Sequence, residues 1–282
     1  ADVNSKNGWI TKPLKGGFSM KLTTAGESHG KALIAVIEGL PAHLEIDTEK
    51  INAELALRQS GFGRGGRQKI ETDRVEILTG VRNRETLGSP LTLCIYNRDY
   101  ENWRAYMSDG ACDVSARTVT KVRPGHADLA GVMKFAQSDA RNVLERASAR
   151  ETAIRVAAGS VFKQYLSALG VEIGGYVKEV CGVKDEGRYA FSELSCAKKS
   201  GLGMLDAAAE KEAEEKVASL RRGNPREGTQ KRLRQLYDVC GEAGRAPCGG
   251  IDEHTGGKGR RGGRRLCLGR FERAGSPRRN LL

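Results

Sequence analysis

The sequence predicts a fold that mixes β-strands with α-helices, and three observations support this. Short runs of apolar and β-branched residues end at glycine or proline, which is typical of strands. Longer stretches carry apolar residues every three or four positions, which is typical of helices. The chain has 282 residues, 39% of them hydrophobic, so it is long enough to bury the core of one large domain or two small ones.

The first hundred residues are predicted to contain one helix among strands. Asp47 and Thr48 are candidate N-caps for this helix, and Ile51, Leu55 and Arg58 fall on one helical stripe. Three apolar runs predict strands, at 31–41 (KALIAVIEGLP), 74–81 (RVEILTGV) and 90–97 (PLTLCIYN).

A second helix is predicted directly after the segment RPGHAD. His126 follows Pro-Gly and precedes this helix, whose N-cap is predicted to be Asp128. Four residues at helical spacing are expected to form its buried apolar face: Leu129, Val132, Met133 and Ala136. The sequence therefore places one histidine at the mouth of a helix.

A third helix, 151–169, has the strongest periodicity, with Ile154, Ala157, Val161, Phe162, Tyr165 and Leu169 expected to face inward. Arg146, Ser148, Arg150 and Thr152 lie at its start, where free N–H groups, the helix dipole and arginine charge together favour phosphate. The alternative is that these residues are ordinary caps. A strand at 171–180 and an exposed, charged helix at 205–222 complete the prediction.

Two glycine-rich segments are candidate ligand loops. TAGESHG, residues 24–30, places Glu27, Ser28 and His29 between glycines, which would let the turn approach a ligand closely. SGFGRGGRQK, residues 60–69, combines four glycines with three cations, which can converge on an anion. The alternatives are an ordinary polar turn and a solvated surface loop.

Composition excludes several classes of protein. No apolar run is long enough for a membrane span and no secretory leader is recognised, so we expect a cytoplasmic protein. Seven scattered cysteines predict reduced thiols and no metal site. The net charge of +12 is concentrated late in the chain: residues 221–282 hold 16 Lys/Arg and 6 Asp/Glu, against 31 and 29 in the other 220 residues. This basic tail is either an RNA-binding arm or a segment that does not fold.

Six motifs, in this order, resemble the chorismate synthase family: TAGESHG, RQSGFGRGGRQKIETDRVEILTGV, TLGSPLTLCIYNRD, ENW, RPGHADLAG and RASARETAIRVAAG. The resemblance covers Met20 to about Arg222. It implies an α+β fold, a β-α-β sandwich in which helices pack between antiparallel sheets, with the second half incomplete in this chain. It also implies a homotetramer.

The chemistry that the resemblance implies is the anti-1,4-elimination of phosphate from 5-enolpyruvylshikimate-3-phosphate, which gives chorismate in the shikimate pathway of aromatic amino acid biosynthesis. The family requires reduced FMN, with either a separate reductase or an intrinsic NADPH-dependent activity as the electron source. No membrane and no specific nucleic acid are expected as partners.

Site residues follow from the same motifs. His29 matches the catalytic histidine beside the leaving phosphate, and His126 matches the one that interacts with reduced flavin. Ser60 stands where the family usually has proline. The resemblance assigns eight further residues, Arg58, Arg64, Arg146, Ala147 and Ser148 to the cofactor and Ser28, Arg123 and Arg150 to the substrate.

Three segments are predicted from these boundaries. Residues 1–19 are expected to be a non-native leader or upstream read-through, because the codons before Met20 can contain a ribosome-binding site. Residues 20–222 are the family-like portion. Residues 223–282 are expected to be a disordered, out-of-frame tail, because a nucleotide string that encodes it can spell family-like sequence in the next reading frame. The alternative functions are therefore an inactive fragment of the enzyme and, more remotely, a basic RNA-binding protein.

Overall fold

The computed structural model describes residues 19–62, 71–222 and 266–268. The segments predicted as a leader and as a basic tail, and the loop that contains Arg64, lie outside the described residues except for a few positions. Contacts divide the described chain into two compact units. Unit 1 contains residues 19–59 and 71–172, and unit 2 contains residues 60–62, 173–222 and 266–268.

Unit 1 is built on antiparallel sheets, which confirms the α+β class. A four-stranded sheet has the order β1-β2-β7-β4 and a three-stranded sheet has the order β3-β6-β5. The elements of unit 1 in chain order are β1 (Lys21–Ala25), β2 (Ala32–Glu38), β3 (Ala42–Glu45), α1 (Thr48–Gln59), β4 (Glu76–Thr79), β5 (Val81–Arg82), β6 (Glu85–Leu87), β7 (Leu91–Tyr96), α2 (Tyr100–Met107), η2 (Ser115–Arg117), α3 (Asp128–Phe135), α4 (Arg141–Leu144), η3 (Ala149–Glu151) and α5 (Thr152–Ala168).

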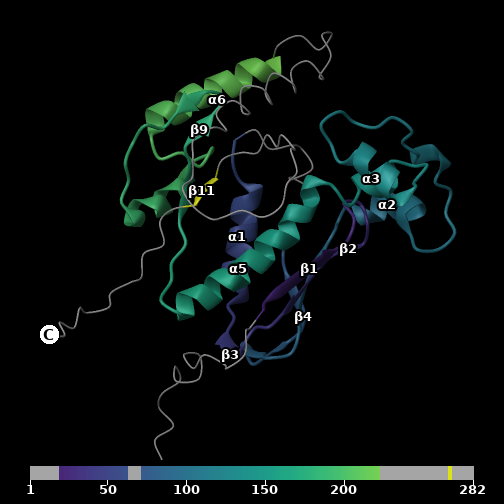
Figure 1. The fold of residues 1–282 in the computed structure, drawn as a ribbon, viewed down its shortest axis with the longest axis horizontal. Helices are drawn as coiled ribbons and strands as arrows, with labels where there is room; N and C mark the ends of the chain where they lie inside the picture. Colours follow the sequence, from purple (N-terminus) through teal and green to yellow (C-terminus); the bar gives the residue numbers. More distant parts are fainter. Residues whose placement is uncertain (1–18, 63–70, 223–265, 269–282) are drawn as a thin grey trace, which may run out of the picture. The chain divides into compact units, whose positions relative to one another are not determined.

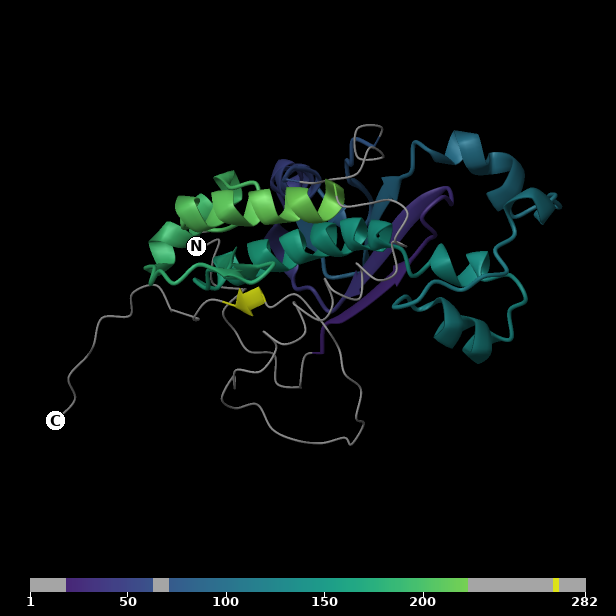
Figure 2. The same ribbon diagram turned by 90° about the horizontal axis from the view of Figure 1, so that it is seen from above.

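The core of unit 1 lies between the four-stranded sheet and two helices. Side chains alternate across β2 and β7, so one face of each strand is apolar and buried. Helices α1 and α5 pack against each other, and α5 also packs on β2 and β7 (Figures 1 and 2). The buried side chains of this layer include Leu33, Ile37, Ile51, Leu55, Leu91, Leu93, Ile95, Ile154 and Val161.

Several predicted elements are confirmed with small changes at their ends. The Asp47 carboxylate accepts from the backbone N–H groups of Glu49 at 3.0 Å and Lys50 at 3.4 Å, so it caps α1 as predicted. Along α5 the predicted inward residues are buried or half-buried, except that Leu169 is 41% exposed. Leu169 lies at the C-cap, one residue beyond the helix, where the helical stripe no longer applies.

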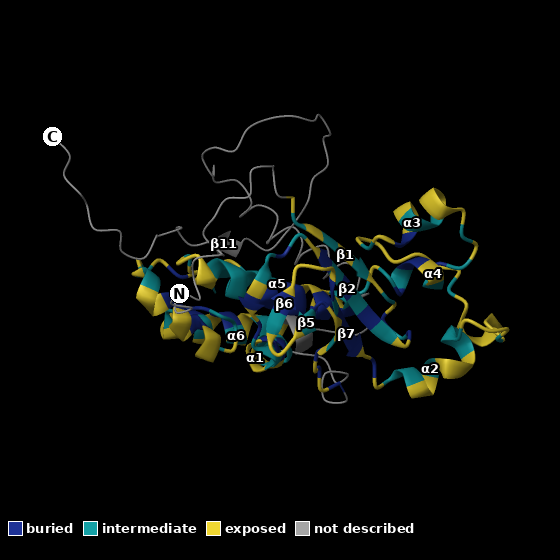
Figure 3. Cartoon of the chain, turned by 90° about the horizontal axis from the view of Figure 1, so that it is seen from below, coloured by how far each residue is buried: buried dark blue, intermediate teal, exposed yellow. Residues whose placement is uncertain are grey.

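The predicted buried face of α3 is wrong. Leu129 is 55% exposed and Met133 75% exposed, and Figure 3 shows the same helix largely in the colour of exposed residues. The predicted N-cap is also wrong, because Ala127 occupies that position and Asp128 is the first helical residue. The Asp128 carboxylate makes no capping bond because it binds Arg123 and His126. Helical spacing indicated the helix correctly but not what lies beside it.

Unit 2 contains short elements around a small core of Val183, Met204, Ala209 and Ala213. The strand predicted at 171–180 is two shorter strands, β8 and β9, interrupted at Lys178. The elements of unit 2 are β8 (Gly175–Val177), β9 (Glu179–Val180), β10 (Val183–Lys184), η4 (Phe191–Lys199), α6 (Ala207–Arg222) and β11 (Leu266–Leu268). No helix among the described residues is long and apolar enough to span a membrane.

Buried Asp185 organises the chain of unit 2 before α6. Its carboxylate accepts from the hydroxyl of Tyr189 at 2.7 Å and from the backbone N–H groups of Gly187, Leu205 and Asp206 at 2.9, 3.2 and 3.0 Å. The hydrogen bond to Asp185 raises the pKa of Tyr189 to about 12. One carboxylate thus connects a turn to the start of a helix.

Candidate active site

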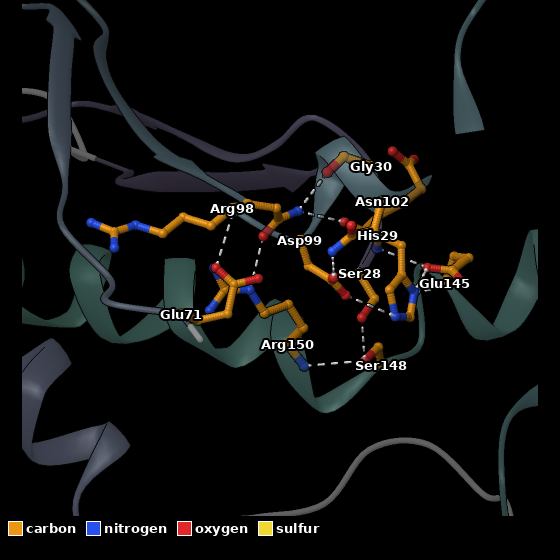
Figure 4. A network of polar contacts seen from close by, with 12 residues as sticks. Ser28, His29, Gly30, Glu71, Arg98, Asp99, Asn102, Glu145, Ser148 and Arg150 are labelled. Carbon is orange, nitrogen blue, oxygen red and sulfur yellow. Dashed lines mark hydrogen bonds and ion pairs between the residues drawn. The ribbon is translucent and has the colours of Figure 1, made fainter. Parts of the chain in front are cut away.

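The TAGESHG motif forms the turn between β1 and β2, at the centre of a polar network (Figure 4). Gly26 has φ of +106°, and a Cβ there would lie 2.3 Å from the carbonyl oxygen of Ala32. The turn therefore needs glycine because the chain approaches its own next strand closely, which is a reason internal to the fold. Ser28 is buried, and its backbone N–H donates to the carbonyl of Glu145 at 3.0 Å.

Glu145 holds His29 in place. The His29 Nδ1 atom lies 2.8 Å and 3.0 Å from the two Glu145 carboxylate oxygens, and the His29 backbone N–H donates to the same carboxylate at 2.9 Å. Arg141 donates to Glu145 at 2.9 Å. Burial acts to raise the pKa of Glu145, but the hydrogen bonds from His29 and Arg141 outweigh it and hold this pKa below its ordinary value. Glu145 is therefore an ionised acceptor.

The other side of the imidazole faces an aromatic ring and a second carboxylate. The centroids of the His29 and Trp103 rings are 4.0 Å apart, with 33° between the ring planes. The guanidinium groups of Arg117 and Arg141 lie 4.6 and 5.1 Å from the Trp103 ring centroid. Glu145 contacts the Nδ1 atom of His29, and the other ring nitrogen, Nε2, lies 3.9 Å from the Asp99 carboxylate.

His126 belongs to a second cluster. Its Nδ1 atom contacts the Asp128 carboxylate, and Arg123 donates to the same carboxylate from Nε at 2.9 Å and from its backbone N–H at 3.1 Å. Burial acts to raise the pKa of Asp128, but hydrogen bonds from Arg123 and His126 bring it down to about 2. His126 and Arg123 remain partly open, with 27% and 52% of their side chains exposed.

The two histidine clusters are related through charge. The hydrogen bond to Asp128 is the main cause that raises the pKa of Arg123, and the charge of Glu145 adds to it. The charge of Glu145, the partner of His29, is the smallest of the contributions to the pKa of Arg123, the neighbour of His126. Each imidazole is held by one buried carboxylate and accompanied by arginine.

Arg150, which the resemblance assigns to the substrate, is buried in this structure. Its guanidinium donates to Asp73 at 2.5 Å and to Asn97 at 2.9 Å, and pairs with Glu71 at 3.5 Å. Only 6% of its side chain is exposed. Its backbone N–H donates to the Ser148 hydroxyl at 3.2 Å, so Arg150 also helps to fix the side chain of Ser148.

Asn97 extends this support to the His29 turn. Its side-chain amide donates to the carbonyls of Glu27 at 3.1 Å and Gly30 at 2.7 Å. The Ser148 hydroxyl in turn donates to the Ser28 hydroxyl at 3.1 Å (Figure 4). The structure therefore brings Ser28 and His29 together with Ser148 and Arg150, which come about 120 residues later in the sequence.

Two of the remaining predicted residues, Arg58 and Arg146, also bind protein groups. Arg58 pairs with Asp73 at 3.3 Å and donates to Thr152 and to the carbonyl of Ala149, both at 3.2 Å. Arg146 donates to the Thr24 hydroxyl at 2.8 Å and pairs with Glu151 at 3.3 Å, with 39% of its side chain exposed. Ala147 is exposed. Arg64 lies outside the described residues.

Sequence reasoning missed the carboxylates and the aromatic ring of this site. Glu145 directly precedes the segment RASAR, and its position between Arg141 and Arg146 is the available signal. Trp103 lies in the ENW motif, whose residue types alone do not indicate a contact with His29. Nothing in the sequence indicated that Asp73 and Asn97 would meet Arg150, because these pairs are 77 and 53 residues apart.

Chemically, the arrangement offers imidazoles beside cations. Two histidines with fixed partners can move protons, and partly exposed arginines can bind an anion such as phosphate. Among the described residues, no group of histidine, cysteine and acidic side chains has the geometry to hold a metal ion.

Comparison with known proteins identifies the family. The family model for chorismate synthase matches residues 20–231. The chorismate synthase of Caldicellulosiruptor bescii is 52% identical over 202 residues, 70% of this chain and 53% of that protein. That of Geobacter sulfurreducens is 54% identical over 196 residues, 68% and 49% of the two chains. The chain thus spans about half the length of these curated relatives.

A solved crystal structure of a chorismate synthase is also similar. It has a TM-score of 0.55 and 38% identity, and the match covers 72% of this chain and 54% of that one. The fold of the model, the order of the six motifs and the positions of both histidines within the matched region agree with this result. The chain therefore belongs to the chorismate synthase family.

Proposed function

We propose that this protein acts as a chorismate synthase, eliminating phosphate from 5-enolpyruvylshikimate-3-phosphate to give chorismate. In this 1,4-elimination an allylic C–O bond breaks, a proton leaves the ring carbon at the other end of the diene being formed, and phosphate departs. The observation that carries the proposal is the pair of histidines, each fixed by a buried carboxylate and accompanied by arginine, in a chain of this family.

In this proposal His29 serves the leaving phosphate. In its doubly protonated form, a ring held through Nδ1 presents Nε2–H, which can donate a proton to a phosphate oxygen as the C–O bond breaks. Arg123 is proposed to bind the substrate, because 52% of its side chain is exposed and its charge is secured by Asp128. Ser28 is only 3% exposed, so any contact with substrate is proposed to involve its hydroxyl, the group that also contacts Ser148.

The residues present fit a reduced flavin mononucleotide in their donor chemistry. The cofactor carries a phosphate and a polar ring edge, and Arg146 offers a partly exposed guanidinium while Ser148, two residues later in the chain, offers a hydroxyl. His126 is proposed to face the flavin ring and to hold a proton there, since its Nδ1 is fixed by Asp128. When bound, reduced FMN supplies electron density to the allylic system.

Arg58 and Arg150 take a different part in this proposal from the one the motifs predict. Both guanidinium groups bind Asp73, and Arg150 is almost fully buried, so we assign them to holding the Ser28 and Ser148 segments in place. Arg64 stays a proposed cofactor residue on the resemblance alone. The same holds for a homotetramer, NADPH as electron source and a cytoplasmic location.

Phosphate release tests the proposal. The 282-residue chain is incubated under anaerobic conditions with substrate, with and without reduced FMN, and phosphate and chorismate are measured. We expect equal amounts of the two products, only with reduced FMN. Folded protein that releases neither would support the alternative, an inactive fragment.

A titration of RNA binding against salt is expected to show only weak binding that is lost as salt rises.

A further inference from the structure

We propose that Glu145 is a positioning residue that keeps the His29 side-chain proton on Nδ1 and so leaves Nε2 as the one ring atom able to exchange protons with a ligand. The catalytic meaning of this inference rests on the proposed function, but the placement of the proton does not. Glu145 and His29 are 116 residues apart, so only the fold brings them together.

The first step concerns what Glu145 can accept. An ionised carboxylate has no proton to donate, and the pKa of Glu145 lies below its ordinary value. Both of its oxygens lie within 3.0 Å of His29 Nδ1. A ring nitrogen this close to a carboxylate must carry the hydrogen, because a bare nitrogen would place two acceptors against each other.

The second step concerns why Glu145 stays in place. Only 1% of its side chain is exposed, so water does not compete for its oxygens. Arg141, one turn earlier, compensates its charge at 2.9 Å. The carboxylate also accepts from the His29 backbone N–H at 2.9 Å, which ties the backbone and the ring of one residue to a single acceptor.

The third step concerns the ring itself. A half-turn about the Cβ–Cγ bond would replace Nδ1 by a carbon and break the contact with Glu145. Trp103 lies against the ring with centroids 4.0 Å apart, and Arg117 and Arg141 flank the indole. The imidazole is therefore enclosed by an acceptor on one edge and an aromatic face on one side, with 19% of the side chain exposed.

Asp99 lies on the Nε2 side of the ring at 3.9 Å, which exceeds hydrogen-bond distance. The structure thus distinguishes the two nitrogens: Nδ1 is held by the protein and Nε2 faces a longer contact. In the neutral ring Nε2 then carries no hydrogen, so His29 delivers a proton to a phosphate only after Nε2 has taken one up, and that proton leaves from Nε2.

Nitrogen NMR of the histidine rings tests this directly. In the uniformly ¹⁵N-labelled full chain, long-range proton–nitrogen correlation distinguishes protonated from bare ring nitrogens, and a His29→Gln spectrum identifies the His29 signals. We expect neutral His29 to show hydrogen on Nδ1 alone. Glu145→Met, which keeps the side-chain length without an acceptor oxygen, is expected to populate the Nε2–H form to at least about a tenth.

Two variants serve as controls. Glu145→Gln retains an acceptor oxygen and is expected to retain the Nδ1–H form. Glu151→Gln removes a different carboxylate with arginine partners, one that contacts Thr24 and not His29, and is expected to leave the His29 signals unchanged. Hydrogen on Nε2 in the wild type, or an unchanged tautomer in folded Glu145→Met, would overturn the inference. Should Glu145→Met not fold, the wild-type spectrum decides.

Activity adds a separate test. Where the wild type releases phosphate, Glu145→Met is expected to lower kcat about 10- to 100-fold and to leave KM within about threefold, because the ring is misplaced and the substrate site is not. Unchanged kcat would count against the inference and leave the proposed function intact. A wild type without phosphate release would count against the proposed function, while the NMR result still decides the tautomer.

Discussion

The guanidinium of Arg150 donates to the carboxylate of Asp73 at 2.5 Å, and both side chains are almost fully buried. This pair supports the candidate site from within, since Arg150 also binds Asn97, whose amide holds the His29 turn. Arg150, which the motifs assign to the substrate, therefore also binds the protein groups that hold the His29 turn.

Arg150→Met is therefore expected to destabilise the protein by about 3–5 kcal/mol, because it leaves Asp73 buried without its closest cation. Arg155→Gln is the matched control: Arg155 also pairs with a carboxylate, but 57% of its side chain is exposed, so its loss is expected to cost less than about 1 kcal/mol. Urea unfolding followed by circular dichroism measures both. An equal decrease in the free energy of unfolding in the two variants would mean that the buried Arg150–Asp73 pair contributes no more to stability than the exposed pair of Arg155.

Gly26→Ala tests the turn that carries His29. The added Cβ would lie 2.3 Å from a backbone oxygen at a φ of +106°, so neither side-chain rotation nor a small shift relieves the clash. We expect a loss of about 2 kcal/mol or more and a change in the His29 ring signals. Gly159→Ala is the control, because a Cβ there meets no atom within 4 Å. A variant as stable as that control would show that the turn is built differently.

Met133→Glu tests the corrected face of α3. Met133 is 75% exposed, so a charged replacement is expected to change stability by less than about 0.5 kcal/mol. Ile154→Ala, in the fully buried face of α5, is expected to cost about 2–5 kcal/mol. Thermal unfolding of the two variants compares them. A large decrease in the stability of Met133→Glu would show that this face of α3 is buried, as helical spacing predicts.

Tyr189 provides a test by pH in unit 2. Its folded pKa of about 12 lies above the ordinary value of 10.0, because the hydroxyl donates to Asp185. The contribution of the Tyr189–Asp185 hydrogen bond to the stability of the folded state is therefore complete below pH 10 and is lost as the pH rises toward 12. Tyrosinate absorbance is expected to show a late-titrating group that Tyr189→Phe removes. A titration without a late component in the wild type would contradict the hydrogen bond.

Local patterns in the sequence predicted much of the fold. An apolar run predicts the strand at 90–97. Caps and apolar residues at helical spacing predict the helix that follows Asp47 and Thr48 and the helix 151–169. The face of α3 was not predictable in this way. Its apolar residues have helical spacing, but spacing does not say whether another layer covers them.

The site was predicted in part. The motifs located His29 and His126, and the structure shows a fixed partner for each. Asp128 is taken for a cap because an acidic residue near a helix start looks like one in the sequence. Glu145, at the end of α4, is missed because its partner His29 is 116 residues away. The burial of Arg150 depends on Asp73 and Asn97, and such long-range pairs leave no mark in a single sequence.

Turnover by histidine variants tests the central claim most directly. His29→Ala and His126→Ala are compared with His43→Ala, whose side chain is 70% exposed on β3. Chorismate formation is measured anaerobically with reduced FMN and saturating substrate. We predict that the first two variants lose at least about 100-fold in kcat while His43→Ala keeps the wild-type rate. A wild type that forms no chorismate, or His29 and His126 variants as active as His43→Ala, would contradict the account.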